Sequence, residues 1–214
     1  MRIGDCFFGG SDSAKFTRLP NEARAADRTV RVRPGGGFGQ DARIRKKAFA
    51  LIDRVSGWER NHIAAIYYAN TGESDKAIDF YRSGIRNYPR YWGFPNNLSE
   101  NRIYLGQYEE GLREGLEAAE LEPDVEPPYR RQLDAYICLD RLSEAKQVAD
   151  KLRERELGGA RIHQRILELC YVEDDQAAIS REVQWFSGKP EEYLSLGLQA
   201  AYLNLHGRRR RPLR

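Results

Sequence analysis

The chain reads Asn70-Thr71-Gly72-Glu73-Ser74-Asp75-Lys76-Ala77, and 34 residues later it reads Tyr104-Leu105-Gly106-Gln107-Tyr108-Glu109-Glu110-Gly111. Each stretch is followed, 17 residues after its first glycine, by a proline, Pro89 or Pro123. Glycine commonly ends a helix and proline stops one, so each period holds two helices joined by a tight turn. A fixed period of this length is typical of stacked helical hairpins. The sequence therefore predicts an all-α repeat fold.

Composition narrows the class of protein. The 214 residues have a mean hydropathy of -0.71, and the apolar runs are far shorter than the roughly 20 residues of a membrane span. Residues 1–8 lack the apolar core of a signal peptide. Cys6, Cys138 and Cys170 are widely spaced and form no CxxC motif, which argues against a disulfide framework or a zinc site. We therefore expect a cytoplasmic protein without a membrane anchor.

The net charge of +3 hides an asymmetry along the chain. Residues 1–56 carry 12 basic and 6 acidic side chains, residues 57–206 carry 18 and 26, and the last eight residues add five arginines. The basic ends could contact nucleic acid or anionic lipid, but solvated ends are the favoured reading, and nucleic acid is not an expected partner. Strongly salt-dependent binding to a DNA duplex would instead indicate that the basic ends bind nucleic acid.

Helix signals divide the chain into segments. Residues 1–40 are rich in glycine and arginine and predict a disordered basic arm. Residues 41–56 predict a leading helix, and Ser56-Gly57-Trp58-Glu59 is a capping box that opens the next one. Ser74 is expected to cap the second helix of that hairpin. The predicted repeats within 57–190 span 58–91, 92–125, 126–159 and a degenerate 160–190, followed by a terminal helix over 191–206 and a basic tail over 207–214.

The repeats resemble the tetratricopeptide repeat (TPR), in which small residues stand where two helices cross closely. Numbered from Trp58 and Trp92, positions 8, 20 and 27 hold Ala65, Ala77 and Gly84 in the first repeat, and Ser99, Gly111 and Ala118 in the second. The third repeat, numbered from Glu126, keeps only Ala145 of these. The resemblance implies a right-handed solenoid of helical hairpins that binds proteins or peptides and carries no catalytic activity or cofactor.

Several segments are similar in sequence to the C-terminal TPR tails of bacterial signalling proteins. They are residues 54–60, 69–78, 95–98, 106–110, 181–185 and 188–190. In such proteins a serine/threonine kinase domain or a winged-helix DNA-binding domain precedes the repeats. The resemblance implies, as an alternative, that this chain is a non-catalytic tail fragment whose partner domain is encoded upstream.

The sequence lacks the motifs of a catalytic or metal site. Residues 35–39 read Gly-Gly-Gly-Phe-Gly but have neither the GxGxxG spacing nor the Gly-Lys-Ser/Thr ending of a phosphate loop, and no His-Arg-Asp or Asp-Phe-Gly occurs. His62, His163 and His206 do not stand at metal-ligand spacing. We therefore expect a protein that is not an enzyme and holds no metal.

The first helix of each TPR hairpin lines the concave face, so the resemblance also implies a partner-binding groove. Asparagine suits it because the amide can pair with both the N–H and the C=O of an extended peptide. The predicted groove residues are Glu59, His62, Ile66, Asn70, Asn96, Asn97, Glu100, Ile103, Tyr104, Arg130, Arg131, Asp134 and Ile137.

A known TPR specificity can be tested against these positions. Chaperone-tail TPRs hold a C-terminal carboxylate with Lys, Asn, Asn, Lys and Arg. Asn97 and Arg131 match two of these, whereas His62, Ile66 and Pro127 stand at the others. The sequence therefore predicts no carboxylate clamp and favours a polar peptide or a neighbouring domain.

Two glycines fall inside one predicted helix, at Gly111 and Gly115. A glycine in a helix interior costs roughly 0.5–1 kcal/mol relative to alanine. The sequence therefore suggests that alanine at both positions would raise the melting temperature, unless the glycines are needed for close packing.

Overall fold

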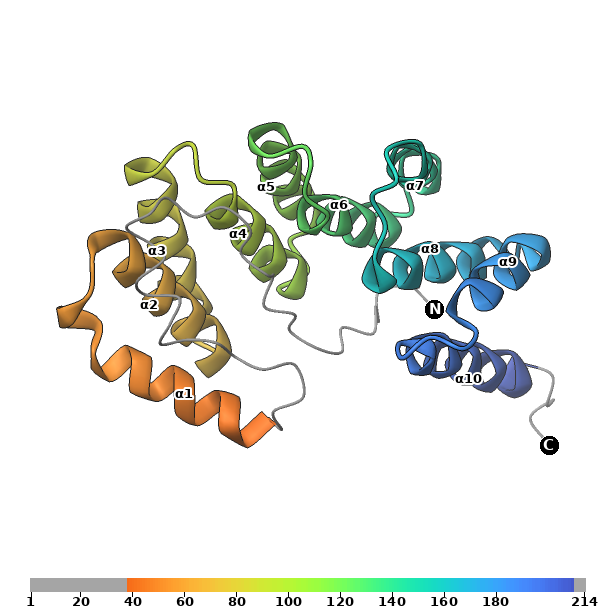
Figure 1. Cartoon of the computed structure of the whole chain (residues 1–214), viewed down its shortest axis with the longest axis horizontal. Coiled ribbons are helices and arrows are strands. Elements are labelled where there is room, and N and C mark those ends of the chain that lie inside the picture. Colours follow the sequence, from red (N-terminus) through yellow and green to blue (C-terminus); the bar gives the residue numbers. More distant parts are fainter. Residues whose placement is uncertain (1–37, 210–214) are drawn as a thin grey trace. The chain divides into compact units, whose positions relative to one another are not determined.

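The computed structural model describes residues 38–209, which are helical with short connections and contain no strand (Figure 1). The predicted disordered arm, apart from residues 38–40, and the last five residues of the basic tail lie outside the described residues. No described helix is long and apolar enough to cross a membrane. The all-α, TPR-type fold of helical hairpins is confirmed.

The chain divides into two compact units, here called the N-terminal unit, with described residues 38–123, and the C-terminal unit, with described residues 124–209. The N-terminal unit holds α1 (Phe38–Ala50), a 3₁₀ turn (Ile52–Arg54), α2 (Gly57–Thr71), α3 (Ser74–Asn87), α4 (Gly93–Tyr104) and α5 (Tyr108–Leu121). The C-terminal unit holds α6 (Pro127–Cys138), α7 (Leu142–Glu154), α8 (Ala160–Glu173), α9 (Gln176–Phe186) and α10 (Glu192–Arg209).

The turn inside each hairpin repeats the same backbone conformation. Gly72, Gly106, Asp140 and Asp174 stand 34 residues apart, and all four have a positive φ, of 81°, 77°, 58° and 57°. This left-handed conformation reverses the chain directly after the first helix of a hairpin. The fourth repeat therefore has the same turn as the others, although its sequence signature is degenerate.

The start of α2 follows the sequence closely. Ser56 accepts a hydrogen bond from the Glu59 N–H, and the Glu59 carboxylate accepts one from the Ser56 N–H, so the capping box is formed. Ser56 must be extended to make this cap, so the leading helix cannot run through to residue 56 as predicted. It ends at Ala50, and the 3₁₀ turn follows it. It also begins at Phe38, so residues 38–40, predicted to be part of the disordered arm, are helical.

Two other helix boundaries differ from the prediction. Ser74 is the first residue of α3, and Glu73 stands at the N-cap, so Ser74 does not cap the helix. At the other end of the chain, α10 continues to Arg209 and takes in residues predicted to be tail.

The core of the N-terminal unit lies between its hairpins. Ala65, Ala77, Phe94 and Leu98 are completely buried there, with Trp58 and Tyr91 packed beside them. The Trp58 ring centroid lies 5.1 Å from that of Tyr91 and 6.1 Å from that of Phe94. These aromatic side chains at helix starts pack one hairpin against the next.

Candidate functional site: polar first helices

The predicted groove residues of the N-terminal unit differ in how accessible they are. Tyr104 is 73% exposed and Asn70 is exposed, whereas Ile103 and Asn96 are buried. Ile103 packs against Gly111 of α5, so its side chain supports the hairpin rather than facing a ligand. The half-buried predicted residues here are Glu59, His62, Ile66, Asn97 and Glu100.

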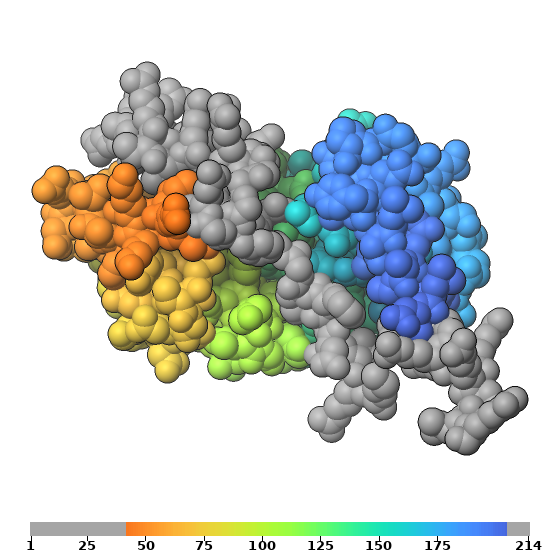
Figure 2. Space-filling view, turned by 90° about the horizontal axis from the view of Figure 1, so that it is seen from below, coloured from red at the N-terminus to blue at the C-terminus, as the bar shows by residue number. Residues whose placement is uncertain are grey.

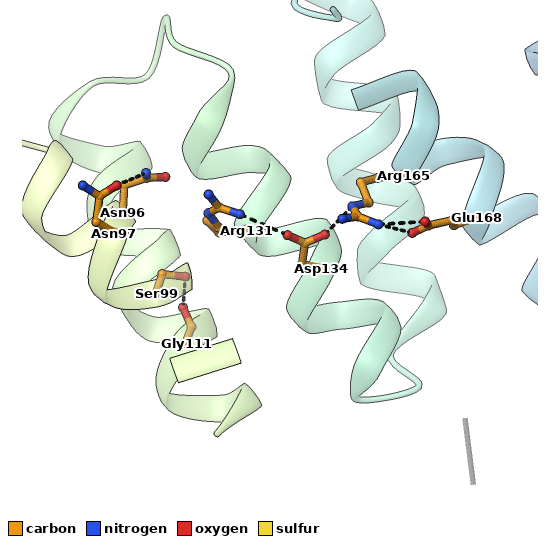
Figure 3. Close-up of polar contacts among 8 residues, drawn as sticks. All are labelled: Asn96, Asn97, Ser99, Gly111, Arg131, Asp134, Arg165 and Glu168. Atoms are coloured by element: carbon orange, nitrogen blue, oxygen red, sulfur yellow. Dashed lines mark hydrogen bonds and ion pairs between the residues drawn. The ribbon is translucent and has the colours of Figure 1, made fainter. Parts of the chain in front are cut away.

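Asn96 and Asn97 of α4 form a side-chain pair (Figure 3). The Asn96 Nδ2 donates to Asn97 Oδ1 at 3.0 Å. The Asn96 Oδ1 is buried and accepts no hydrogen bond within the described part of the chain. A buried acceptor without a donor is costly, and this oxygen is closed off from solvent, so the half-buried Asn97 is the member of the pair that a ligand could reach.

His62 lies in an aromatic environment. Its ring stacks on Trp58 at 5.2 Å with the planes 9° apart, and it meets Phe94 edge-on at 6.1 Å. Burial disfavours the charged imidazolium and lowers the pKa of His62 to about 4. His62 is therefore neutral at pH 7 and offers a partner no positive charge.

In the C-terminal unit the predicted groove residues Arg130, Arg131, Asp134 and Ile137 are all buried on α6. Asp134 lies between two arginines, because its carboxylate is 3.5 Å from Arg131 Nη1 and 2.6 Å from Arg165 Nε on α8. Figure 3 shows this series of contacts between the two helices.

Arg165 extends the series to Glu168. Its Nη1 donates to both carboxylate oxygens of Glu168, at 2.6 and 2.7 Å. Burial raises the pKa of Glu168, and the Arg165 charge opposes that shift. Two cations and two anions thus alternate along Arg131, Asp134, Arg165 and Glu168, here called the polar ladder, and their formal charges cancel.

Sequence reasoning missed Arg165 and Glu168, although a signal for both was present. They stand 34 residues after Arg131 and Asp134, and those stand 34 residues after Asn97 and Glu100. Positions 6 and 9 of three successive first helices therefore hold an amide or arginine followed by an acid. The degenerate signature of the fourth repeat concealed this periodicity.

A separate cavity of about 210 Å³ lies in the C-terminal unit, beside His163. The His163 Nδ1 is 2.7 Å from Glu182 Oε2, and its ring stacks on Trp185 at 3.7 Å. No predicted groove residue lines this cavity. Its lining comes from Leu152, Arg153, Glu156, Leu157, Gly158, Ile162, His163 and Ile166.

Metal binding finds no geometric support in the described part of the chain. No three His, Cys, Asp or Glu side chains come together there as metal ligands would. Cys170 of α8 is a buried cysteine that forms no disulfide. Burial raises the pKa of Cys170 to about 11, so its thiol is not a reactive thiolate at pH 7.

Comparison with known proteins identifies the fold. No protein-family model and no curated protein sequence matches the chain. Among solved structures, a thermophilic TPR protein of Thermus thermophilus is similar, with a TM-score of 0.64, 17% identity, and coverage of 86% of this chain and 97% of that one. PilF of Pseudomonas aeruginosa gives a TM-score of 0.61 at 18% identity, with coverage of 89% of this chain and 88% of that one. At this identity the similarity shows the fold alone, and that fold is the helical-hairpin fold of TPR proteins.

Proposed function

We propose that this chain is a non-catalytic, cytoplasmic interaction module that binds a protein or peptide partner through the first helices of its hairpins. The observation that carries the proposal is that positions 6 and 9 are polar in three successive first helices. They hold Asn97 and Glu100 in α4 and the four residues of the polar ladder in α6 and α8. A helix that served only to pack against its neighbours would need apolar side chains at these positions. The ladder side chains are largely buried and link α6 to α8, which fixes these two first helices relative to each other.

The chemistry of these side chains favours an extended, polar peptide. The half-buried Asn97 amide of α4 can donate to and accept from a peptide backbone. A carboxylate clamp is not proposed. The Arg131 side chain is only 5% exposed and lies against Asp134, so a free carboxylate would compete with a buried acidic partner.

The test uses the full chain against a displayed library of extended peptides. Asn97→Ala removes an amide from α4, and Asn87→Ala is its matched control, because Asn87 is an exposed asparagine on α3, the second helix of a hairpin. We expect Asn97→Ala to reduce peptide capture and Asn87→Ala to leave it unchanged. If both variants capture peptide equally well, α4 is not part of the binding surface.

The alternative proposal is that the chain is the TPR tail of a bacterial serine/threonine kinase or winged-helix regulator, and that its partner is that domain. The sequence similarity of residues 54–60, 69–78, 95–98, 106–110, 181–185 and 188–190 to such tails supports it. The DNA directly upstream of the coding sequence tests it. A kinase or winged-helix reading frame there would support the alternative, and an unrelated gene would count against it.

A further inference from the structure

The cavity of about 210 Å³ in the C-terminal unit has an apolar floor and an open mouth. Leu152, Ile162 and Ile166, which line it from α7 and α8, are at most 2% exposed. Glu156 and Gly158 line the same cavity and are exposed, so it opens to solvent. No predicted groove residue lines it, so an inference about this cavity does not depend on the proposed function.

Contacts with α9 hold the His163 ring in one orientation at the cavity. Its Nδ1 is 2.7 Å from Glu182 Oε2, and Glu182 is itself only 8% exposed. The ring stacks on Trp185 with 3.7 Å between centroids, and the Phe186 ring meets it edge-on at 6.5 Å. Figure 2 shows α9, in blue, at the surface of the C-terminal unit. A ring held in this way presents one fixed edge to the cavity.

The nitrogen that His163 turns away from Glu182 is a hydrogen-bond acceptor. An ionised carboxylate can only accept hydrogen bonds, so the neutral imidazole carries its hydrogen on Nδ1 and its lone pair on Nε2. Nε2 lies towards Gly158, because a Cβ on residue 158 would stand 3.3 Å from it. The absence of a side chain at Gly158 thus leaves space in front of Nε2. A ligand in this space would need a hydrogen-bond donor.

The charge and the size of the cavity restrict the ligand further. Arg153 and Glu156, the lining residues with a permanent charge, have opposite signs, so the lining offers no net charge. A charged ligand would lose hydration there without a compensating charge, which favours a neutral one. An apolar cavity of about 150 Å³ is large enough to bind benzene. The cavity described here is larger, so it has room for a single ring with a small substituent.

From the oriented His163 ring, the space at Gly158 and the neutral, apolar lining we propose that this cavity binds a neutral aromatic ring with one hydrogen-bond donor, of the phenol class. The hydroxyl donates to His163 Nε2, and the ring lies on the apolar floor. A phenol can reach the cavity as a free small molecule or as the tyrosine side chain of a partner protein, and the chemistry of recognition is the same.

The first experiment is a ligand series measured by calorimetry on the wild-type full chain at pH 8, where a phenol is neutral. The probe is p-cresol, which is also the side chain of tyrosine. It should bind at least about fivefold more tightly than 4-methylanisole, because the methylated oxygen cannot donate and leaves the acceptor unsatisfied. It should also bind more tightly than the anion 4-methylbenzoate. Absence of p-cresol binding, equal binding of 4-methylanisole, or tighter binding of 4-methylbenzoate would overturn the proposal.

A glycine variant tests whether the ligand occupies this cavity. Gly158→Ala places a Cβ in front of Nε2 and should weaken p-cresol binding at least about tenfold. Gly158 has no positive φ, so alanine fits its backbone. Gly197→Ala is the matched control, because Gly197 is also exposed and its Cβ would meet no atom within 4 Å. It should bind like the wild type, and equal binding by the two variants would overturn the assignment.

Urea denaturation checks that both glycine variants fold. The ligand series uses the wild type, so it tests the proposal even if a variant is unstable.

Two short peptides distinguish the sources of the phenol. A capped glycine–tyrosine–glycine peptide is compared with its phenylalanine counterpart. Binding of the tyrosine peptide about as tightly as p-cresol would support the proposal with a partner's tyrosine as the occupant. Binding of p-cresol alone would support it with a free phenol. Equal binding of the two peptides would overturn it, because the hydroxyl would then contribute nothing.

Discussion

The Ser99 hydroxyl donates a hydrogen bond of 2.6 Å to the carbonyl oxygen of Gly111, which joins α4 to α5 inside the second hairpin (Figure 3). Both residues are buried. They occupy positions 8 and 20 of the repeat, where the TPR pattern calls for small side chains. Here the small residues bring the two backbones close enough for a side chain of one helix to reach the main chain of the other.

This contact reverses the sequence-based suggestion for Gly111. A Cβ on residue 111 would lie 2.6 Å from Ile103 Cγ1 and 3.1 Å from the Ser99 carbonyl oxygen, and a backbone atom cannot move aside cheaply. We expect Gly111→Ala to lower the free energy of unfolding by about 1–3 kcal/mol in urea denaturation. Gly197→Ala is the control, because its Cβ would meet no atom within 4 Å, and it should stabilise the protein by roughly 0.5–1 kcal/mol. A stabilising Gly111→Ala would show that α4 and α5 separate easily.

Loss of the Ser99 hydroxyl should also be measurable. Ser99→Ala removes a buried hydrogen bond and should cost about 1 kcal/mol of unfolding free energy. Ser180→Ala removes an exposed hydroxyl that bonds only within α9, to the Gln176 carbonyl, and should change stability little. Equal effects of the two substitutions would mean that the α4–α5 hydrogen bond contributes nothing.

The polar ladder predicts that Arg165 matters more for stability than an exposed arginine. Its removal would leave the Asp134 and Glu168 carboxylates without their shared cation, and breaking a buried ion pair costs roughly 3–5 kcal/mol. We expect Arg165→Met to unfold at a much lower urea concentration than the wild type. Arg86→Met, at an exposed arginine of α3, is the control. If the two variants unfold at the same urea concentration, water screens the ion pairs of the ladder too strongly for them to contribute to stability.

His62 gives the fold a dependence on pH. The pKa of His62 in the folded protein, about 4, lies below the ordinary value of 6.5, so the folded state resists protonation. The stability that neutral His62 contributes is present above pH 6.5 and is lost as the pH falls towards 4, by at most about 3 kcal/mol. In urea titrations from pH 7 to 4, His62→Phe should lose less stability than the wild type. If the wild type and His62→Phe lose the same stability between pH 7 and 4, the His62 ring is exposed to water in the folded protein.

The sequence predicts most helix positions because the turn residues carry the information. Gly72 and Gly106 mark the first two turns, and the Ser56–Glu59 capping box marks the start of α2. The end of the leading helix was wrong, since the extended Ser56 cap interrupts a continuous apolar pattern. Ser74 was misread as a cap because its residue type favours that position, whereas the chain places Glu73 there.

The candidate site was less predictable than the fold. Positions 6 and 9 could be read as polar in each repeat, but their pairing between α6 and α8 depends on how the hairpins stack. Arg165 and Glu168 show this, because their partner Asp134 stands about one repeat earlier in the chain. The sequence also did not show which predicted groove residues are exposed: Tyr104 is open to solvent, whereas its neighbour Ile103 is buried. The predicted groove stays a prediction for binding experiments to test.

The aspartate at the fourth turn has a consequence for how the chain opens. Besides its left-handed backbone, Asp174 accepts a 2.6 Å hydrogen bond from the Tyr202 hydroxyl of α10. A glycine there would relax the turn but could not hold α10. We therefore expect the turn between α8 and α9 to unfold locally together with the last helix, so that their amide hydrogens exchange with solvent at similar rates.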